Sequence, residues 1–149
     1  DNDKLWDFFW NLSDFIMPIE CYGIFGLKHD KLLLTKYYDK NIIKANYLPY
    51  KYSLEGDGYL AFGIASTVDN TFNEIFVETF KYIKLWTSSP SKVIDQLNHW
   101  GIKNIPDLSF IDNFPVVSSS LSDENANIKH SIDIIKDLSR IYEIENNDA

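Results

Sequence analysis

Hydrophobic and polar residues follow two different periods along this chain, and the best-patterned stretch lies between Tyr59 and Trp100. From Tyr59 to Thr67, large apolar side chains alternate with small ones, which is the period of a β-strand. The next segment, Thr71 to Trp86, fits a helix with one apolar face. It also fits an extended chain with aliphatic residues on one face and aromatic residues on the other. Its many β-branched and aromatic residues favour the extended form.

Three other segments carry apolar residues at the three- and four-residue spacing of an amphipathic helix. Polar cap candidates precede the first and the third, and a proline suited to a first helical turn opens the second. We therefore expect helices at Lys4 to Ile16, Ser89 to Trp100 and Glu124 to Glu143, with the cap candidates Asp1, Asn2, Asp3, Ser122 and Asp123. The expected apolar stripe of the first helix is Leu5, Phe8, Phe9, Leu12, Phe15 and Ile16, widened by Trp6 and Trp10.

The segments between these helices and strands are less regular. Ile19 to Leu27 holds two glycines in an apolar run, which predicts an irregular strand or a close backbone approach. Lys31 to Tyr38 has the composition of a buried strand, and Asn41 to Leu48 fits either a short helix or an edge strand. Glu55-Gly-Asp-Gly58 predicts a turn whose acids lie in water, at the tip of a hairpin from Lys51 to Thr67.

The stretch that follows Gly101 has the character of a loop. It contains two prolines, and no lysine, arginine or histidine occurs from Asn104 to Ile128. These features predict a long ordered loop, with a short strand at Leu108 to Ile111 as an option. Together the segments predict a single domain, residues 1–149, of the α+β class. A mainly antiparallel β-sheet would be flanked by N-terminal, central and C-terminal helices.

Composition narrows the classes of partner. The formal net charge is −8 and the isoelectric point is about 4.7, so we expect no binding to nucleic acid or to an anionic membrane surface. The single cysteine, Cys21, cannot form an internal disulfide, which is typical of a reducing compartment. No run of 18 apolar residues occurs, and acids stand where a secretory signal has lysines. We expect a cytoplasmic protein, although the absence of an initiator Met leaves export open.

The residues that usually perform catalysis are scattered. His29, His99 and His130 stand alone on separate segments, without the short spacing that seeds a metal site, so no metal or other cofactor is expected. Cys21 lies in an apolar run that should raise its pKa and make it a poor nucleophile. No glycine-rich phosphate loop is present.

A carboxylate pair is the one catalytic alternative that the residues support. Glu74 and Glu78 are close in sequence, and Asp57 could approach them across a hairpin, which would suit a small hydrolase. The competing interpretation is that these glutamates lie in solvent or pair with Lys81 and Lys84 across strands. On a strand, the two glutamates would share a face with large aromatic side chains.

The middle half of the chain resembles bacterial toxin-immunity proteins, the small acidic inhibitors that accompany contact-dependent and other polymorphic toxins. The resemblance is carried by the successive segments GYLAFGIAST, EIFVETFKYIKLWTSSPSKVIDQLNHWGI and LSFIDNFPVV. It implies a protein that is not an enzyme and that binds a cognate toxin domain, often a nuclease, and occludes its active site. A nuclease presents cationic residues where it holds phosphate, so an acidic inhibitor complements it electrostatically.

Acidic residues are the candidate contacts for such a toxin. The candidates are Asp107, Asp112, Asp123 and Glu124 of the cation-free loop, with Glu55 and Asp57 of the predicted turn as a second patch. The alternative is that these acids only solubilise the protein or cap helices. Aromatic side chains would supply much of the binding energy, but the sequence does not indicate which of them are exposed.

Overall fold

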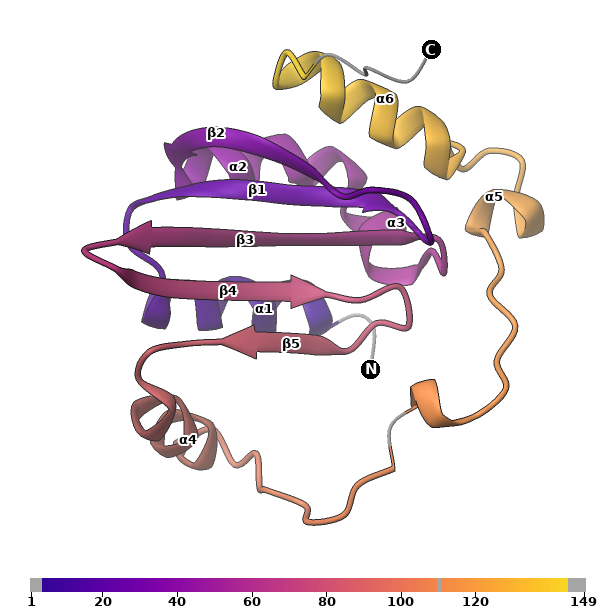
Figure 1. Cartoon of the computed structure of the whole chain (residues 1–149). Coiled ribbons are helices and arrows are strands. Elements are labelled where there is room, and N and C mark those ends of the chain that lie inside the picture. Colours follow the sequence, from indigo (N-terminus) through magenta and orange to yellow (C-terminus); the bar gives the residue numbers. More distant parts are fainter. Residues whose placement is uncertain (1–3, 110, 145–149) are drawn as a thin grey trace.

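A five-stranded antiparallel sheet forms the centre of the protein, in a computed structural model that describes residues 4–109 and 111–144. The strand order is β2-β1-β3-β4-β5, so β1 and β3 lie in the middle and β2 and β5 form the edges (Figure 1). The strands are β1 (Glu20–Leu27), β2 (Leu33–Asp39), β3 (Leu60–Val68), β4 (Thr71–Val77) and β5 (Ile83–Trp86).

Helices occupy the two ends of the described chain and the connection between β2 and β3. They are α1 (Leu5–Ile16), α2 (Lys40–Tyr47), α3 (Lys51–Gly56), α4 (Pro90–His99), α5 (Leu121–Glu124) and α6 (Ser131–Ile141), with 3₁₀ turns η2 (Leu48–Tyr50) and η3 (Ile111–Asn113). Figure 1 shows α1, α2 and α3 on the same side of the sheet, behind it in that view, and α6 alongside α2. In the described part of the chain, no helix has the length and apolar run that crossing a bilayer requires.

The main hydrophobic core lies between these helices and one face of the sheet. Every strand contributes alternate residues to it, as expected for a sheet with one face packed. The strand residues on this face include Cys21, Phe25, Leu60, Phe62, Ile64, Ile75 and Val77, and the helices add Trp6, Phe9, Trp10, Ile43, Tyr47, Ile134 and Leu138. Phe62 contacts Trp6, Phe9 and Tyr47, so its ring lies where α1 and α2 meet the sheet.

The opposite face of the sheet carries a smaller, separate cluster. It consists of Ile24, Ala61, Ala65 and Phe76, with Tyr22 packed against it. No helix covers this face in Figure 1, and we call it the open face. The side chains at its margins are exposed, which leaves a sheet surface available to another molecule.

The observed elements confirm the α+β prediction and most of its parts. Helices occur where the N-terminal and central helices were expected, and the strand expected from Tyr59 to Thr67 is β3, Leu60–Val68. The segment from Thr71 to Trp86 is extended, as its composition favoured, but it forms two strands because residues 78–82 turn back. Aliphatic Ile75 and Leu85 face the helices while aromatic Phe76 faces the open side, as the extended pattern predicted.

Other expectations need correction. Lys51 to Gly56 is helix α3 rather than a hairpin strand, because Pro49 lies in a 3₁₀ turn that leads the chain into a further helical turn. The option of a helix is correct for Asn41 to Leu48. β2 is an edge strand in which Thr35 alone is buried, so the prediction of a buried strand was wrong. No strand occurs in the described residues near Leu108 to Ile111.

The first and last helices also differ in detail from the predictions. In α1 the buried stripe runs through Trp6, Phe9, Trp10 and Ser13, so Phe15 lies at its margin and is 43% exposed. The cap candidates Asp1, Asn2 and Asp3 lie outside the described residues. The C-terminal helix begins at Ser131, not near Glu124, since α5 and a turn precede it.

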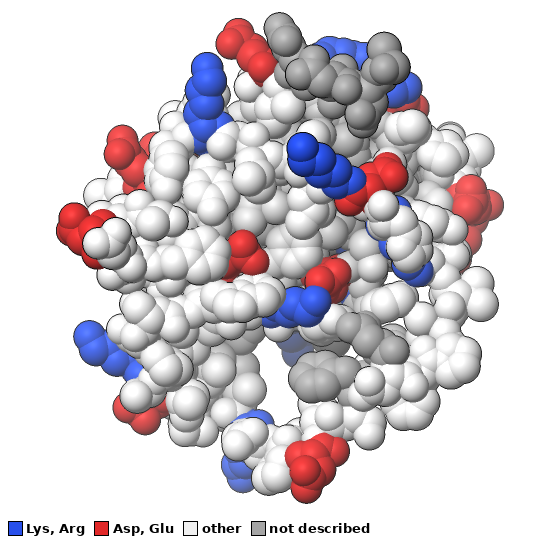
Figure 2. Space-filling model, in the orientation of Figure 1, with Lys and Arg blue, Asp and Glu red and all other residues white. Residues whose placement is uncertain are grey.

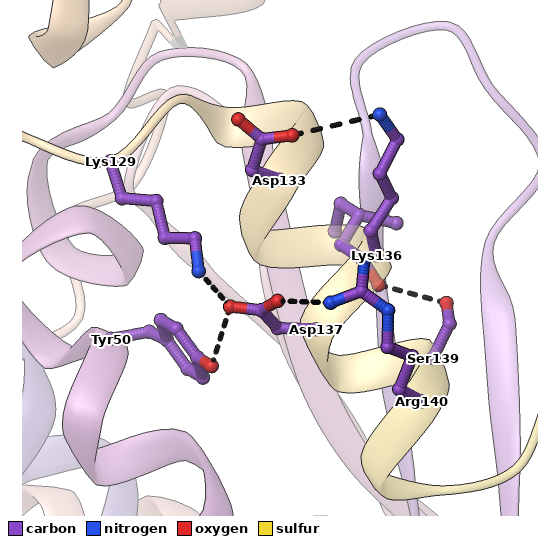
Figure 3. Close-up of polar contacts among 8 residues, drawn as sticks. Tyr50, Lys129, Asp133, Lys136, Asp137, Ser139 and Arg140 are labelled. Carbon is purple, nitrogen blue, oxygen red and sulfur yellow. Dashed lines mark hydrogen bonds and ion pairs between the residues drawn. The ribbon is translucent and has the colours of Figure 1, made fainter.

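A polar cluster attaches α6 to the rest of the protein (Figure 3). Asp137 accepts a hydrogen bond of 3.0 Å from the Tyr50 hydroxyl and forms ion pairs with Lys129 and Arg140. The hydrogen bond from Lys129 is the main cause that lowers the pKa of Asp137. Because Tyr50 belongs to η2, these contacts tie the C-terminal helix to the chain that leads into α3.

Gly63, at the centre of the sheet, provides a test of this packing. A Cβ there would lie 2.6 Å from the Ile75 carbonyl oxygen and 3.1 Å from the Phe76 Cα, both backbone atoms of β4. Gly63→Ala should therefore lower the free energy of unfolding by about 2 kcal/mol, measured by urea denaturation. In the control Gly26→Ala, the closest atom is the flexible end of Leu32, at 2.9 Å, so the loss should be less than half as large. Equal losses would contradict the backbone overlap.

Candidate functional site on the open face of the sheet

One residue from each strand forms a row across the open face. From β2 to β5 the row consists of Tyr37, Tyr22, Ala65, Glu74 and Trp86. Because paired residues of antiparallel strands point to the same side, these five side chains are neighbours on one surface. We call this set the Glu74 row. It places a single carboxylate between aromatic side chains.

The two tyrosines form one side of the row. Their rings pack edge to face, with centroids 5.3 Å apart. The Tyr37 hydroxyl accepts a hydrogen bond of 3.0 Å from the backbone N–H of Thr67, which fixes its ring across the end of β1. Burial is the main cause that raises the pKa of Tyr22, followed by the neighbouring Tyr37 and Glu74. The Tyr22 hydroxyl and the Glu74 carboxylate therefore lie close enough to interact across Ala65.

Glu74 is the central polar group of the site. Its side chain is partly buried and makes no hydrogen bond or ion pair with any described residue. Burial raises its pKa, and attraction to Lys84 offsets this only in part. The ammonium of Lys84 is instead paired with Glu78. The carboxylate of Glu74 is thus partly removed from water without receiving a hydrogen bond in return. Such a group lowers the free energy of unfolding of the isolated protein.

Small residues lie between the two sides of the row, and larger neighbouring side chains bury them. Ala65 lies between Tyr22 and Glu74, and Ala61 and Gly63 continue along the same strand. The ring of Phe76 lies above Gly63, where a Cβ would meet its Cδ2 atom at 2.8 Å. The exposed rings of Phe72 and Trp86 stand at the margin. The result is a largely apolar surface with a buried centre, aromatic margins, one acid, Glu74, and one nearby lysine, Lys84.

Lys84 is a cation on this side of the molecule that attracts that acid, although its ammonium is paired with Glu78. Figure 2 shows the protein from the open side, where most of the surface is uncharged and the charged side chains are spread widely, many of them toward the edges. An anionic group in such surroundings interacts strongly with a cation because little water screens it. The arrangement is suited to binding a positively charged group that also presents apolar or planar surface.

Asp57 lies elsewhere and has a structural role. It is 1% exposed, so the prediction of an acid lying in water at a turn was wrong. One carboxylate oxygen accepts a hydrogen bond of 2.9 Å from the N–H of Tyr59. The other accepts from the hydroxyls of Ser120 and Ser131, at 2.8 and 2.9 Å, and from the N–H of Leu121 at 3.0 Å. Asp57 therefore ties the C-terminal segment to the start of β3.

Glu55 is also buried, so the prediction that its carboxylate lies in water was wrong as well. Its carboxylate accepts a hydrogen bond of 3.0 Å from the N–H of Trp6 in the first turn of α1. A helix N-terminus has unpaired N–H groups and a partial positive charge, so this acid stabilises the helix. Because α3 brings Glu55 and Asp57 inward, the two acids do not form an exposed patch.

The acids of the long loop remain at the surface. Asp107, Asp123 and Glu124 are exposed, with the last two in α5, whereas the side chain of Asp112 lies outside the described residues. The loop also exposes apolar side chains, namely Ile105, Leu108, Phe114 and Val117. Acidic and apolar side chains are thus both exposed along the loop.

Residues considered for chemistry do not combine into a reactive group. Glu78 is paired with Lys84, and Asp57 is saturated by hydrogen bonds, so neither is a free carboxylate beside Glu74. Burial raises the pKa of the Cys21 thiol to about 11, as its apolar surroundings predicted. Across residues 4–109 and 111–144, no three potential metal ligands are grouped around a common point.

Lys81 was expected to pair with the glutamates across strands, but the structure gives it a different position. Its ammonium group points inward and donates hydrogen bonds of 2.9 and 2.7 Å to the carbonyls of Leu54 and Leu60. The backbone of Lys81 is left-handed, with φ of 61°. The turn that produces this conformation, between β4 and β5, directs the side chain toward Asp57.

Tyr22, Tyr37 and Trp86 were also not singled out from the sequence. Only the sheet register brings them together with Glu74, although the extended pattern did place Glu74 beside aromatic residues. Comparisons with protein-family models, with curated proteins and with solved structures gave no match. The functional argument therefore depends on the geometry of the Glu74 row and on the surface charge.

Glu74→Gln should stabilise the isolated protein. At pH 7 the carboxylate is ionised in both states, and its ionised form is less favourable in the folded state because burial raises the pKa. As the pH falls, the folded protein protonates first, so the advantage of the Gln variant should disappear toward pH 4. Thermal unfolding of both proteins from pH 4 to 8 measures this. A Gln variant less stable than wild type at pH 7 would contradict the lack of a partner for Glu74.

Lys81 should make stability rise with pH. Burial lowers its pKa to about 7, whereas the unfolded chain keeps the ordinary value of 10.5. Above pH 7 the unfolded chain therefore binds more protons, and stability increases by up to about 1.4 kcal/mol per pH unit. Lys81→Met should remove this slope, and the exposed-lysine control Lys36→Met should keep it. The measurement is urea unfolding from pH 7 to about 8, below the ordinary thiol pKa of 9.0 near which Cys21 of the unfolded chain ionises.

Proposed function

We propose that this protein is a non-enzymatic inhibitor that binds a basic partner, a cognate bacterial toxin domain with nuclease activity, and occludes its active site. The open face of the sheet is the proposed contact surface. The observation that supports this most directly is Glu74, a partly buried carboxylate without a partner among exposed aromatic side chains. The resemblance to toxin-immunity proteins supplies the kind of partner.

The aromatic side chains of the Glu74 row suit a binding surface. Tyr37 and Trp86 are each 47% exposed, yet their rings are anchored on strands of a rigid sheet. Tyrosine and tryptophan contribute much of the energy at protein interfaces because they bury large areas while losing little conformational entropy. Burying these rings against a partner would also complete the desolvation of Glu74 and strengthen its attraction to a cation.

The net charge of −8 supports a basic partner. Complementary charge accelerates encounter between an acidic inhibitor and a nuclease, whose active site is cationic where it holds phosphate. The loop acids Asp107, Asp123 and Glu124 can extend this contact, because they are exposed. We assign the central contact to the open face and the loop to its periphery.

The function is tested by capturing the partner on the tagged protein from cells of the source organism and assaying it for nuclease activity. The wild-type protein should inhibit that activity stoichiometrically. Glu74→Gln should weaken inhibition at least about tenfold, since it leaves a cation of the partner without its counter-charge. Asp95→Asn, a loss of one exposed acid on α4, is the matched control and should change inhibition less than about twofold.

The combined variant Asp107→Asn, Asp123→Asn and Glu124→Gln separates the two surfaces. If the open face is central, this variant should mainly slow association and leave dissociation unchanged. Inhibition lost only in the loop variant would move the interface to the loop. Capture of a partner that has no activity for the protein to inhibit would overturn the proposed function.

A further inference from the structure

Large apolar residues recur at every third position in the loop between α4 and α5. The series consists of Ile102, Ile105, Leu108, Ile111, Phe114 and Val117, and we call it the loop series. All six side chains are exposed, from 42% for Ile102 to 98% for Val117. An exposed apolar set of this extent among polar residues is typical of a surface that contacts another molecule.

The spacing of the loop series does not belong to a helix or a strand. A helix has 3.6 residues per turn and a strand has two, so neither would place six residues spaced by three on one face. A backbone with three residues per turn, such as polyproline II, would align them. In this structure the segment is irregular, because Asp107 is left-handed with φ of 57° and Ile111–Asn113 forms a 3₁₀ turn. The chain's own fold therefore does not account for the spacing.

Hydrogen bonds hold the loop at both ends. At its start, the N–H of Ile102 donates to the carbonyl of Leu97, 2.8 Å away, which closes the end of α4. At its far end, the Lys28 ammonium donates to the hydroxyl of Ser118. Val117 directly precedes this anchored residue, and its side chain is almost fully in water. The loop is thus attached to the protein while its apolar side chains point away from the core.

The path of the loop leaves these side chains accessible. In Figure 1 the chain from α4 to α5 runs in a wide arc outside the sheet. Figure 2, in the same orientation, shows an opening between the lower part of this arc and the body of the protein. A second molecule can therefore contact the loop series without any unfolding of the sheet or its helices.

The charge of the loop indicates the kind of molecule. No lysine, arginine or histidine occurs from Asn104 to Ile128, and the acids Asp107, Asp123 and Glu124 are exposed. In a symmetric dimer, the same acids of two copies would approach one another, and an anionic bilayer surface would repel them. A protein groove with an apolar floor and a rim of lysine and arginine complements both the series and the acids.

We propose that the loop series inserts into an apolar groove of the basic partner protein, as a second contact beside that of the open face. The inference rests on the proposed function for the identity of that partner. Acids act mainly on the rate of encounter, whereas burial of apolar side chains mainly slows dissociation. The acids and the apolar side chains of the loop therefore make contributions that kinetic measurements can separate.

The test compares two triple variants for binding to the nuclease captured on the tagged protein. The apolar variant combines Ile105→Ser, Leu108→Ser and Val117→Ser. It should raise the Kd at least about tenfold, mainly through faster dissociation, because each buried aliphatic side chain is worth about a factor of ten. The control combines Ile19→Ser, Leu48→Ser and Ile94→Ser, whose side chains are 72%, 55% and 53% exposed. The control should change the Kd less than about threefold.

Folding and footprint are measured on the same proteins. Both triple variants replace exposed side chains, so each should keep the wild-type midpoint of urea unfolding. In the wild-type complex, amide hydrogen exchange should slow in residues 102–109 and 111–117. An unchanged dissociation rate of the apolar variant, an equal effect of the control, or loop amides that exchange as fast in the complex as in the free protein would each overturn the inference.

Other occupants of the loop series have their own signatures. Self-association of the wild-type protein that the apolar variant loses, measured by sedimentation equilibrium, would assign the series to a second copy of this chain. Binding to phosphatidylcholine vesicles that the apolar variant loses would assign it to a lipid surface. Either result would overturn the proposed groove.

This contact and the proposed function fail separately. A captured nuclease that wild type and apolar variant inhibit equally well would leave the inhibitor role intact and remove the role of the loop series. A captured protein that binds through the loop series but has no nuclease activity to inhibit would support the contact and overturn the proposed function. Capture of no partner would overturn both.

Discussion

Packing of helices against only one face of the sheet is the constraint on which the rest of the structure depends. The main core joins α1, α2 and α6 to alternate residues of the strands, and Phe62 lies at its centre. The other residues of the same strands must then face outward, because side chains of a strand alternate between two faces. With no helix on that side, aromatic and small residues form a surface, and the candidate site is a direct product of the one-sided packing.

Buried polar contacts hold the long C-terminal segment to this sheet. Asp57 accepts hydrogen bonds from Ser120 and Ser131, and Asp137 binds Tyr50. These carboxylates are satisfied by several donors each, which is what allows acids to lie inside or at the margin of the fold. Their role is structural, and it removes Asp57 from the set of acids that could meet a partner. Glu74 differs from these acids because it accepts no such hydrogen bonds, so no structural role accounts for its partly buried position.

Glu74 illustrates how a proposed binding site can oppose stability. A desolvated carboxylate without a partner is unfavourable in the free protein, and the same lack of a partner leaves it available to a cation. Sites of this kind occur where the missing interaction is supplied by another molecule. The rigid sheet holds Tyr22 and Trp86 on either side, so little conformational entropy is lost when the surface is covered.

The sequence alone determined the class of fold and the positions of most elements, because periodic patterns and turn residues are local properties. It also indicated that Cys21 is an inert thiol and that an extended segment would place Glu74 beside aromatic residues. Tertiary structure decided which acids are exposed: Glu55 and Asp57 turned inward because α3 formed where a hairpin strand was expected. It also decided the register that unites Tyr37, Tyr22, Ala65, Glu74 and Trp86. Pairing between strands distant in sequence depends on the packing of the whole sheet, and no local pattern encodes it.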